Sequence, residues 1–192
     1  KVELFRDGLH KENMDTFFEG LDIVVDELDN LAVKYLIREY AKKYRLPVVM
    51  AADNGDNAVV DIERYDLDEN TPFFHGRMGN DISYETLSKL DKFGIGRTIA
   101  KHVGPENVTI KMLESLPEMG KTIVSWPQLG GAAIINGVAV SYCIRKIANG
   151  ELLESNRALV SIDEKLIPNY FDDAEVKKRT DSEAVFRKIF NL

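Results

Sequence analysis

The chain has 192 residues, of which 44% are hydrophobic and 30% charged, the balance of an ordinary soluble globular domain with one substantial core. Its 25 Lys and Arg against 32 Asp and Glu give a net charge of −7, and no basic run is present, so we expect no nucleic acid partner. A single cysteine excludes an intrachain disulfide, and with no signal-like segment and no apolar run of about 20 residues we expect a cytoplasmic protein without membrane contact.

The first third of the chain alternates strand-like and helix-like segments. In chain order, we expect a strand over 2–5, a helix over 13–18, a strand over 21–28, a helix over 30–44 and strands over 48–52 and 58–65. Residues 21–28 are almost continuously apolar, which is typical of a strand buried on both faces of a parallel sheet. Apolar residues recur at helical spacing over 30–44, and Pro47 stops that helix before the next strand.

The strand, helix, strand order over 21–52 predicts a right-handed crossover in an α/β fold. We therefore expect a Rossmann-like, mostly parallel sheet flanked by helices. Residues 58–65 alternate apolar and charged side chains, which indicates a strand with one wet face at the sheet edge, after a loop over 53–57.

The rest of the chain is mainly helical. The expected elements are short helices over 83–93, 96–102 and 109–116, a long apolar helix over 128–149, a strand over 158–162 and an amphipathic helix over 172–190. We expect one α/β domain over 1–192, with a small helical insertion or cap over 80–120. Because the chain opens with Lys1 rather than Met, we expect further sequence upstream.

Polar residues mark the end of the strand over 21–28. Asp26, Asp29 and Asn30 lie where this strand ends and the next helix begins. Ligands of open α/β sheets bind beyond the carboxyl ends of strands, and a helix N-terminus attracts anions while a nearby carboxylate can hold Mg²⁺. The alternative is that Asp29 or Asn30 only caps the helix.

The segment Val24-Val25-Asp26-Glu27-Leu28-Asp29-Asn30, with Lys34 one turn later, resembles the V-V-D-x-x-D-N pattern of the ThiF/MoeB/HesA family, whose superfamily includes the ubiquitin-activating enzymes. The surrounding order is also similar, since Pro47 opens the next strand and a helix rich in small residues over 130–147 ends at Gly150. The resemblance covers most of residues 1–66 and 127–150, as in the C-terminal portion of such a protein.

The resemblance implies ATP and Mg²⁺ as cofactors. The family's counterpart of Asp29 lies beside the triphosphate and its Mg²⁺, so Asp29 is expected to be catalytic and to hold the metal. The residues expected to bind cofactor or border the acceptor are Asp26, Asp29, Asn30, Lys34, Asp53 and Asn54. A carboxylate that binds Mg²⁺ and a lysine that offsets phosphate charge suit a reaction that depends on positioning and electrostatics.

Several family features have no counterpart in this chain. The glycine-rich ATP loop is missing, and one cysteine cannot form the paired CxxC motifs that hold zinc in many members, so we expect no zinc. No cysteine lies between residues 53 and 128 to form a thioester. Cys143, inside the apolar helix, is expected to be a buried, inert thiol.

Two aromatic segments have open roles. Residues 73–77 (Phe-Phe-His-Gly-Arg) can line an acceptor pocket, or the aromatics can pack the loop to the core while His75 is solvated. Trp126, before the long helix, can be a packing anchor or a substrate wall.

The preferred interpretation is part of an ATP-dependent adenylyltransferase that activates a carboxylate, either a protein C-terminus such as that of a ubiquitin-like carrier or a small molecule. The alternatives are a non-catalytic binding or scaffolding module with the same fold, and half of a different dinucleotide-binding oxidoreductase. The resemblance also implies a homodimer.

Overall fold

The computed structural model describes residues 2–79, 81–124 and 127–192. Its strands are β1 (Val24–Val25), β2 (Pro47–Asn54), β3 (Asn57–Arg64) and β4 (Asn156–Ser161). Its α-helices are α1 (Met14–Phe18), α2 (Leu31–Tyr44), α3 (Tyr84–Ser88), α4 (Lys92–Val103), α5 (Ile110–Ser115), α6 (Gly130–Ala148), α7 (Asp163–Leu166) and α8 (Asp173–Phe190). Short 3-10 helices are η1 (Phe73–Gly76), η2 (Pro105–Asn107) and η3 (Leu116–Glu118). The α/β class is thus confirmed.

The strands form one four-stranded sheet in the order β1-β2-β3-β4. β1 and β2 are parallel, whereas β2 with β3 and β3 with β4 are antiparallel. The expectation of a mostly parallel sheet was therefore wrong, because only Gly55 and Asp56 separate β2 from β3 and so short a connection can make a hairpin but not a crossover. Gly55 supports this turn with a φ of +79°.

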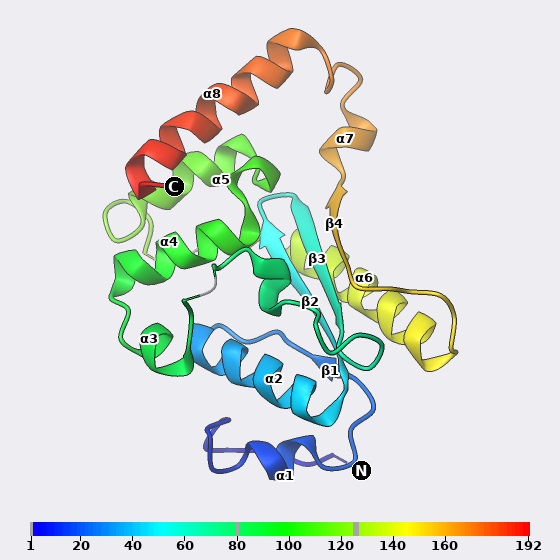
Figure 1. The fold of residues 1–192 in the computed structure, drawn as a ribbon. Coiled ribbons are helices and arrows are strands. Elements are labelled where there is room, and N and C mark those ends of the chain that lie inside the picture. Colours follow the sequence, from blue (N-terminus) through cyan, green and yellow to red (C-terminus); the bar gives the residue numbers. More distant parts are fainter. Residues whose placement is uncertain (1, 80, 125–126) are drawn as a thin grey trace.

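Helices cover both faces of the sheet, with α2 on one side and α6 on the other (Figure 1). Successive side chains of a strand point to opposite faces, so Val48 joins the core under α2 and Val49 the core under α6. This double cover explains why all eight residues of β3 are buried. The expectation that this strand lies at the edge with a wet face was wrong, because its charged residues pair inside the protein.

Most of the remaining predicted elements were recovered with shifted ends. The strand expected over 21–28 pairs only at Val24 and Val25, and the strand expected over 2–5 is not formed. Short α7 was not expected. Trp126 and Lys1 lie outside the described residues. Helices α3, α4 and α5 occupy the region expected to be a helical insertion, and its status as a separate cap stays a prediction.

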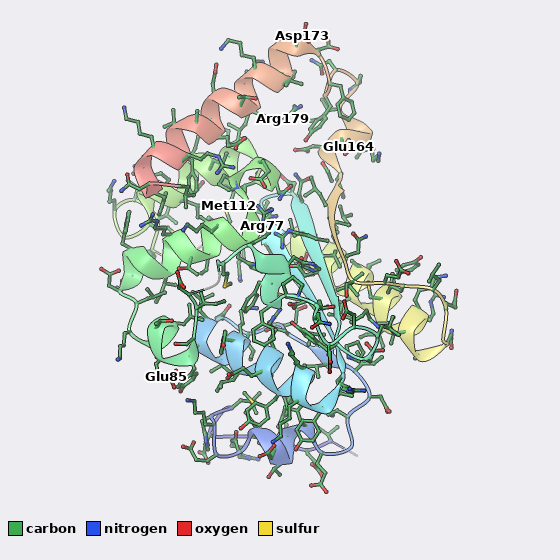
Figure 2. The ribbon with its side chains drawn as sticks, viewed as in Figure 1. Arg77, Glu85, Met112, Glu164, Asp173 and Arg179 are labelled. Carbon is green, nitrogen blue, oxygen red and sulfur yellow. The ribbon has the colours of Figure 1, made fainter. Side chains whose placement is uncertain are left out.

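The C-terminal helix α8 packs on α5 at the side of the molecule opposite α1 (Figure 1). Met112, labelled in Figure 2, belongs to the apolar cluster that joins these helices, together with Phe186 of α8. Within the described ranges, no helix combines the length and the apolar character needed to cross a bilayer.

Candidate functional site

A cleft of about 500 Å³ lies at the carboxyl ends of the parallel strands β1 and β2. The described residues that line it are Glu27, Leu28, Asp29, Leu31, Lys34, Met50, Ala51, Ala52, Asp53, Ile99, His102, Val103, Gln128 and Asn136. They come from the β1 end, the start of α2, the β2 end, α4, α6 and the segment just before α6. Its volume is within the range of small-molecule sites, which is about 300–1,000 Å³.

The cleft brings together three of the six predicted site residues. Asp29 and Lys34 come from the β1–α2 connection and Asp53 from the end of β2, and all three line the cleft. Asp26, Asn30 and Asn54 do not line it. Nucleotide binding by any of the six stays a prediction.

Asn30 is the N-cap of α2. Its Oδ1 accepts hydrogen bonds from the backbone N–H groups of Ala32 at 3.0 Å and Val33 at 3.1 Å. These amides would otherwise be free at the helix N-terminus. The alternative that one of Asp29 and Asn30 only caps the helix is therefore confirmed for Asn30. Asp29 does not cap the helix and lies exposed at the cleft.

Asp26 points into the protein rather than into the cleft. Its carboxylate is fully buried, is paired with Arg38, and accepts a hydrogen bond from Nζ of Lys34 at 3.0 Å. Burial raises the pKa of Asp26, but the charges of Arg38 and Lys34 outweigh burial and hold that pKa below its usual range. Asp26 thus anchors Lys34, whose side chain lines the cleft.

Arg38 connects this pair to the sheet. It is fully buried, and its Nε donates to Oε2 of Glu63 at 2.9 Å. The other oxygen of Glu63 accepts from the Tyr65 hydroxyl at 2.8 Å and from the backbone N–H of Phe74 at 2.6 Å. The guanidinium also lies 4.1 Å from the centroid of the Phe74 ring, a cation–π contact. Asp26, Arg38 and Glu63 therefore form one continuous buried ion network.

Beside this network, Asp61 gathers a second set of polar groups. Arg157 donates to both carboxylate oxygens at 2.8 and 2.6 Å, while Nε2 of His75 and of His102 lie 3.5 and 3.4 Å from them. Burial and the charge of Arg157 lower the pKa of His102 well below 6.5, so this imidazole is neutral near pH 7. His102 also lines the cleft, so it is shared by the cleft and the polar groups around Asp61.

The segment over 73–77 packs mainly into the core. Phe74 is fully buried, contacts the ring of His102 edge-on, and has a φ of +53°, a conformation held by its N–H bond to Glu63. Arg77, labelled in Figure 2, donates to the backbone carbonyl of His102 at the end of α4. None of these residues lines the cleft, but Phe73 and Gly76 line a separate cavity of about 270 Å³, so the acceptor-pocket role stays a prediction. The packing role describes Phe74, whereas His75 is not solvated as that alternative expected, because its side chain is only 19% exposed.

Several residues of the cleft were not predicted. Glu27 lies inside the segment over 24–30 but at a position that the family pattern leaves open. His102 of α4, Gln128 just before α6 and Asn136 of α6 reach the cleft only through folding, and no local motif marks them. Cys143, in contrast, is buried as expected, and burial raises the pKa of its thiol.

The polar groups of the cleft fit a magnesium-bound phosphate group. Mg²⁺ is usually held by one or two carboxylates together with substrate phosphates, and Asp29 offers an exposed carboxylate. Lys34 supplies a fixed positive charge on the same wall. No cluster of three or more His, Cys, Asp or Glu side chains suited to hold a metal by itself occurs in the part of the chain that the structure describes.

Comparison with known proteins places these features in context. The sequence profile of the ThiF family matches residues 1–183. An uncharacterized protein, MT1398, of Mycobacterium tuberculosis (strain CDC 1551 / Oshkosh) is 34% identical over 161 residues, which are 84% of this chain and 22% of that protein. The chain therefore spans about a fifth of the length of this relative. No solved structure matches it.

Proposed function

Because the chain belongs to the ThiF family, we propose that it forms the carboxylate-side part of an ATP-dependent adenylyltransferase. The observation that carries the proposal is the meeting of Asp29, Lys34 and Asp53 in one cleft at the ends of β1 and β2. Ligands of α/β sheets bind at this end of the strands. The activity, substrate and partners of the whole protein are part of the proposal.

In this proposal ATP supplies an adenylyl group, which passes to a carboxylate oxygen of the substrate as pyrophosphate leaves. Asp29 would hold Mg²⁺, which would help to neutralise the phosphate charge. Lys34, fixed by Asp26, offsets phosphate charge without having to reorganise during the reaction. Asp53, which lines the cleft at the end of β2, would border the substrate carboxylate.

The first experiment is isothermal titration of the complete natural protein with ATP and Mg²⁺. We expect saturable binding that Asp29→Asn weakens by about tenfold, the loss expected for one charge-assisted contact of about 1.4 kcal/mol. Asp173→Asn is the matched control, because Asp173 lies at the far start of α8 (Figure 2). No binding by the unmodified protein would refute the proposal.

A second candidate function is a non-catalytic binding module with the same fold. It is favoured by the cap at the start of α2, where Asn30 already occupies two amides that would otherwise face a phosphate. Pyrophosphate release separates the two functions. Formation of pyrophosphate from ATP in the presence of a carboxylate supports the enzyme. Binding of Mg-ATP without pyrophosphate formation, for every carboxylate of a test panel, supports the binding module.

The substrate carboxylate can belong to a protein C-terminus, such as that of a ubiquitin-like carrier, or to a small molecule. A homodimer is part of the same proposal. Sedimentation analysis of the complete protein tests it, and a monomer at all concentrations would contradict it.

A further inference from the structure

The second cavity, of about 270 Å³, is lined by α2 and by the segment around η1. It shares no described lining residue with the cleft. Tyr35 and Lys42, two turns apart on one face of α2, form one wall, and Phe73 and Gly76 of η1 belong to another. Sites for drug-sized ligands measure about 300–1,000 Å³, so this cavity suits a smaller molecule.

Lys42 is the one charged side chain on the described walls of this cavity. It is exposed, and its ammonium group forms no ion pair or hydrogen bond with another described residue. The next residue, Lys43, is in contrast paired with Asp15. The chain has a net charge of −7, but the described walls carry this free ammonium group and no carboxylate. The cavity is therefore locally favourable for an anion.

Phe73 gives the cavity an apolar wall beside this charge. Nζ of Lys42 lies 6.0 Å from the centroid of the Phe73 ring. The ring packs edge-on against Tyr35, with 5.4 Å between the centroids, and against the buried Tyr65, with 5.9 Å between the centroids. These contacts hold the ring in place before a ligand arrives, which lowers the entropic cost of binding. A ligand with an anionic group and a flat apolar part can therefore contact both walls.

Two uncharged polar groups of the walls are also free. The hydroxyl of Tyr35 and the side-chain amide of Asn70 form no hydrogen bond with a described residue. The Tyr35 hydroxyl keeps accessible surface and Asn70 is exposed, so a ligand can reach both. Burial and the charges of Glu39 and Glu85, which do not line the cavity, raise the pKa of Tyr35. Its hydroxyl therefore stays protonated near pH 7 and can donate.

We propose that this cavity binds a small organic carboxylate with a flat apolar body, at a site separate from the cleft. The carboxylate accepts hydrogen bonds from Nζ of Lys42, and the apolar body packs on the ring of Phe73. The Tyr35 hydroxyl and the Asn70 amide are available for a further polar group of the ligand. The site does not depend on the proposed function, because no residue assigned to nucleotide or Mg²⁺ binding lines it.

A phosphate group is the competing anion, because lysine also binds phosphate. One ammonium group offsets one negative charge, which is what a carboxylate carries, whereas a phosphate ester carries about −1.5 to −2 near pH 7. The described walls offer no arginine and no second lysine for the additional charge. The carboxylate is therefore the favoured ligand, and phosphate becomes an arm of the experiment.

The test is a ligand-observed NMR titration of the complete natural protein. The probes are benzoate, its neutral isostere benzamide, acetate, which lacks the apolar ring, and inorganic phosphate. We expect saturable binding of benzoate that is about tenfold tighter than that of benzamide, the effect of one charge-assisted hydrogen bond. Acetate and phosphate should bind more weakly than benzoate, because neither can pack on Phe73. Lys42→Met should abolish the preference for benzoate over benzamide.

Lys188→Met is the matched control, because Lys188 is exposed on α8 and does not line the cavity, and it should keep the preference. No binding of benzoate, equal binding of benzoate and benzamide, or a preference that survives Lys42→Met overturns the inference. Binding of acetate or phosphate at least as tight as that of benzoate also overturns it. Saturating Mg-ATP should leave benzoate binding unchanged, whereas displacement of benzoate would place it in the cleft and refute a separate site. If Mg-ATP itself does not bind, the adenylyltransferase proposal fails while this site stands.

Discussion

Replacement of Arg38 by methionine tests the buried ion network directly. Arg38 is fully buried between Asp26 and Glu63, which are also fully buried. Methionine has a similar length and no charge, so Arg38→Met removes the bridge with little loss of volume. Asp26 keeps its bond to Lys34, but Glu63 keeps only the donors from Tyr65 and Phe74.

The expected loss of stability follows from this geometry. Removing one partner of a buried ion pair costs about 3–5 kcal/mol, because the remaining charge is buried without compensation. The cation–π contact with Phe74 adds about 0.5–2 kcal/mol, part of which the methionine recovers by packing on the ring. For a chain of this size, a loss of 3–5 kcal/mol lowers Tm by about 6–20 °C.

The assay is urea unfolding followed by circular dichroism, with Arg45→Met as the control. The Arg45–Glu69 pair is exposed and 3.3 Å long, so its loss should cost less than about 1 kcal/mol. The double variant Arg38→Met with Glu63→Gln should regain part of the stability, because it removes the charge left unpaired. A single-variant loss no larger than that of the control would refute the reasoning about the network.

Three further outcomes are expected. Asn30→Ala should lower the free energy of unfolding by about 1 kcal/mol in urea titration, because α2 loses its N-cap, and an unchanged midpoint would contradict this role. The folded-state pKa of His102 lies below its unfolded value of 6.5, so its contribution to stability is full above pH 6.5 and is lost as the pH falls below it, by up to about 1.4 kcal/mol per unit. His102→Gln should flatten this slope in unfolding measured from pH 7.5 to 5, and equal slopes would contradict the assignment. Gly55→Ala should lower the stability measured by thermal unfolding by more than about 1 kcal/mol. The φ of Gly55 is +79°, and an added Cβ would lie 1.9 Å from Oγ1 of Thr109. An unchanged Tm would contradict this prediction.

Local sequence patterns determined the elements that depend on short-range physics. Helical spacing of apolar residues located α2 and α6, and Pro47 marked the start of β2 within one residue. The Asp29-Asn30 step marked the start of α2, because an Asn side chain can reach the amides two and three residues ahead. The same pattern led to the ThiF family, whose profile matches residues 1–183.

Tertiary structure decided how these elements pair and which side chains meet. The alternation of charge in β3 indicated an exposed face, but its acidic residues Asp61 and Glu63 are buried because arginines from β4 and α2 reach them from segments distant in the chain. The spacing of apolar and charged residues along one strand carries no information about ion pairs with residues far away in the sequence. Likewise, the sequence shows Asp26 and Asp29 as two acidic residues near the end of the same strand and does not distinguish their roles. In the structure Asp26 is buried and paired with Arg38, whereas Asp29 lines the cleft. Sequence alone thus specified where the chain can bend and cap, while packing between remote segments decided which charges face a ligand.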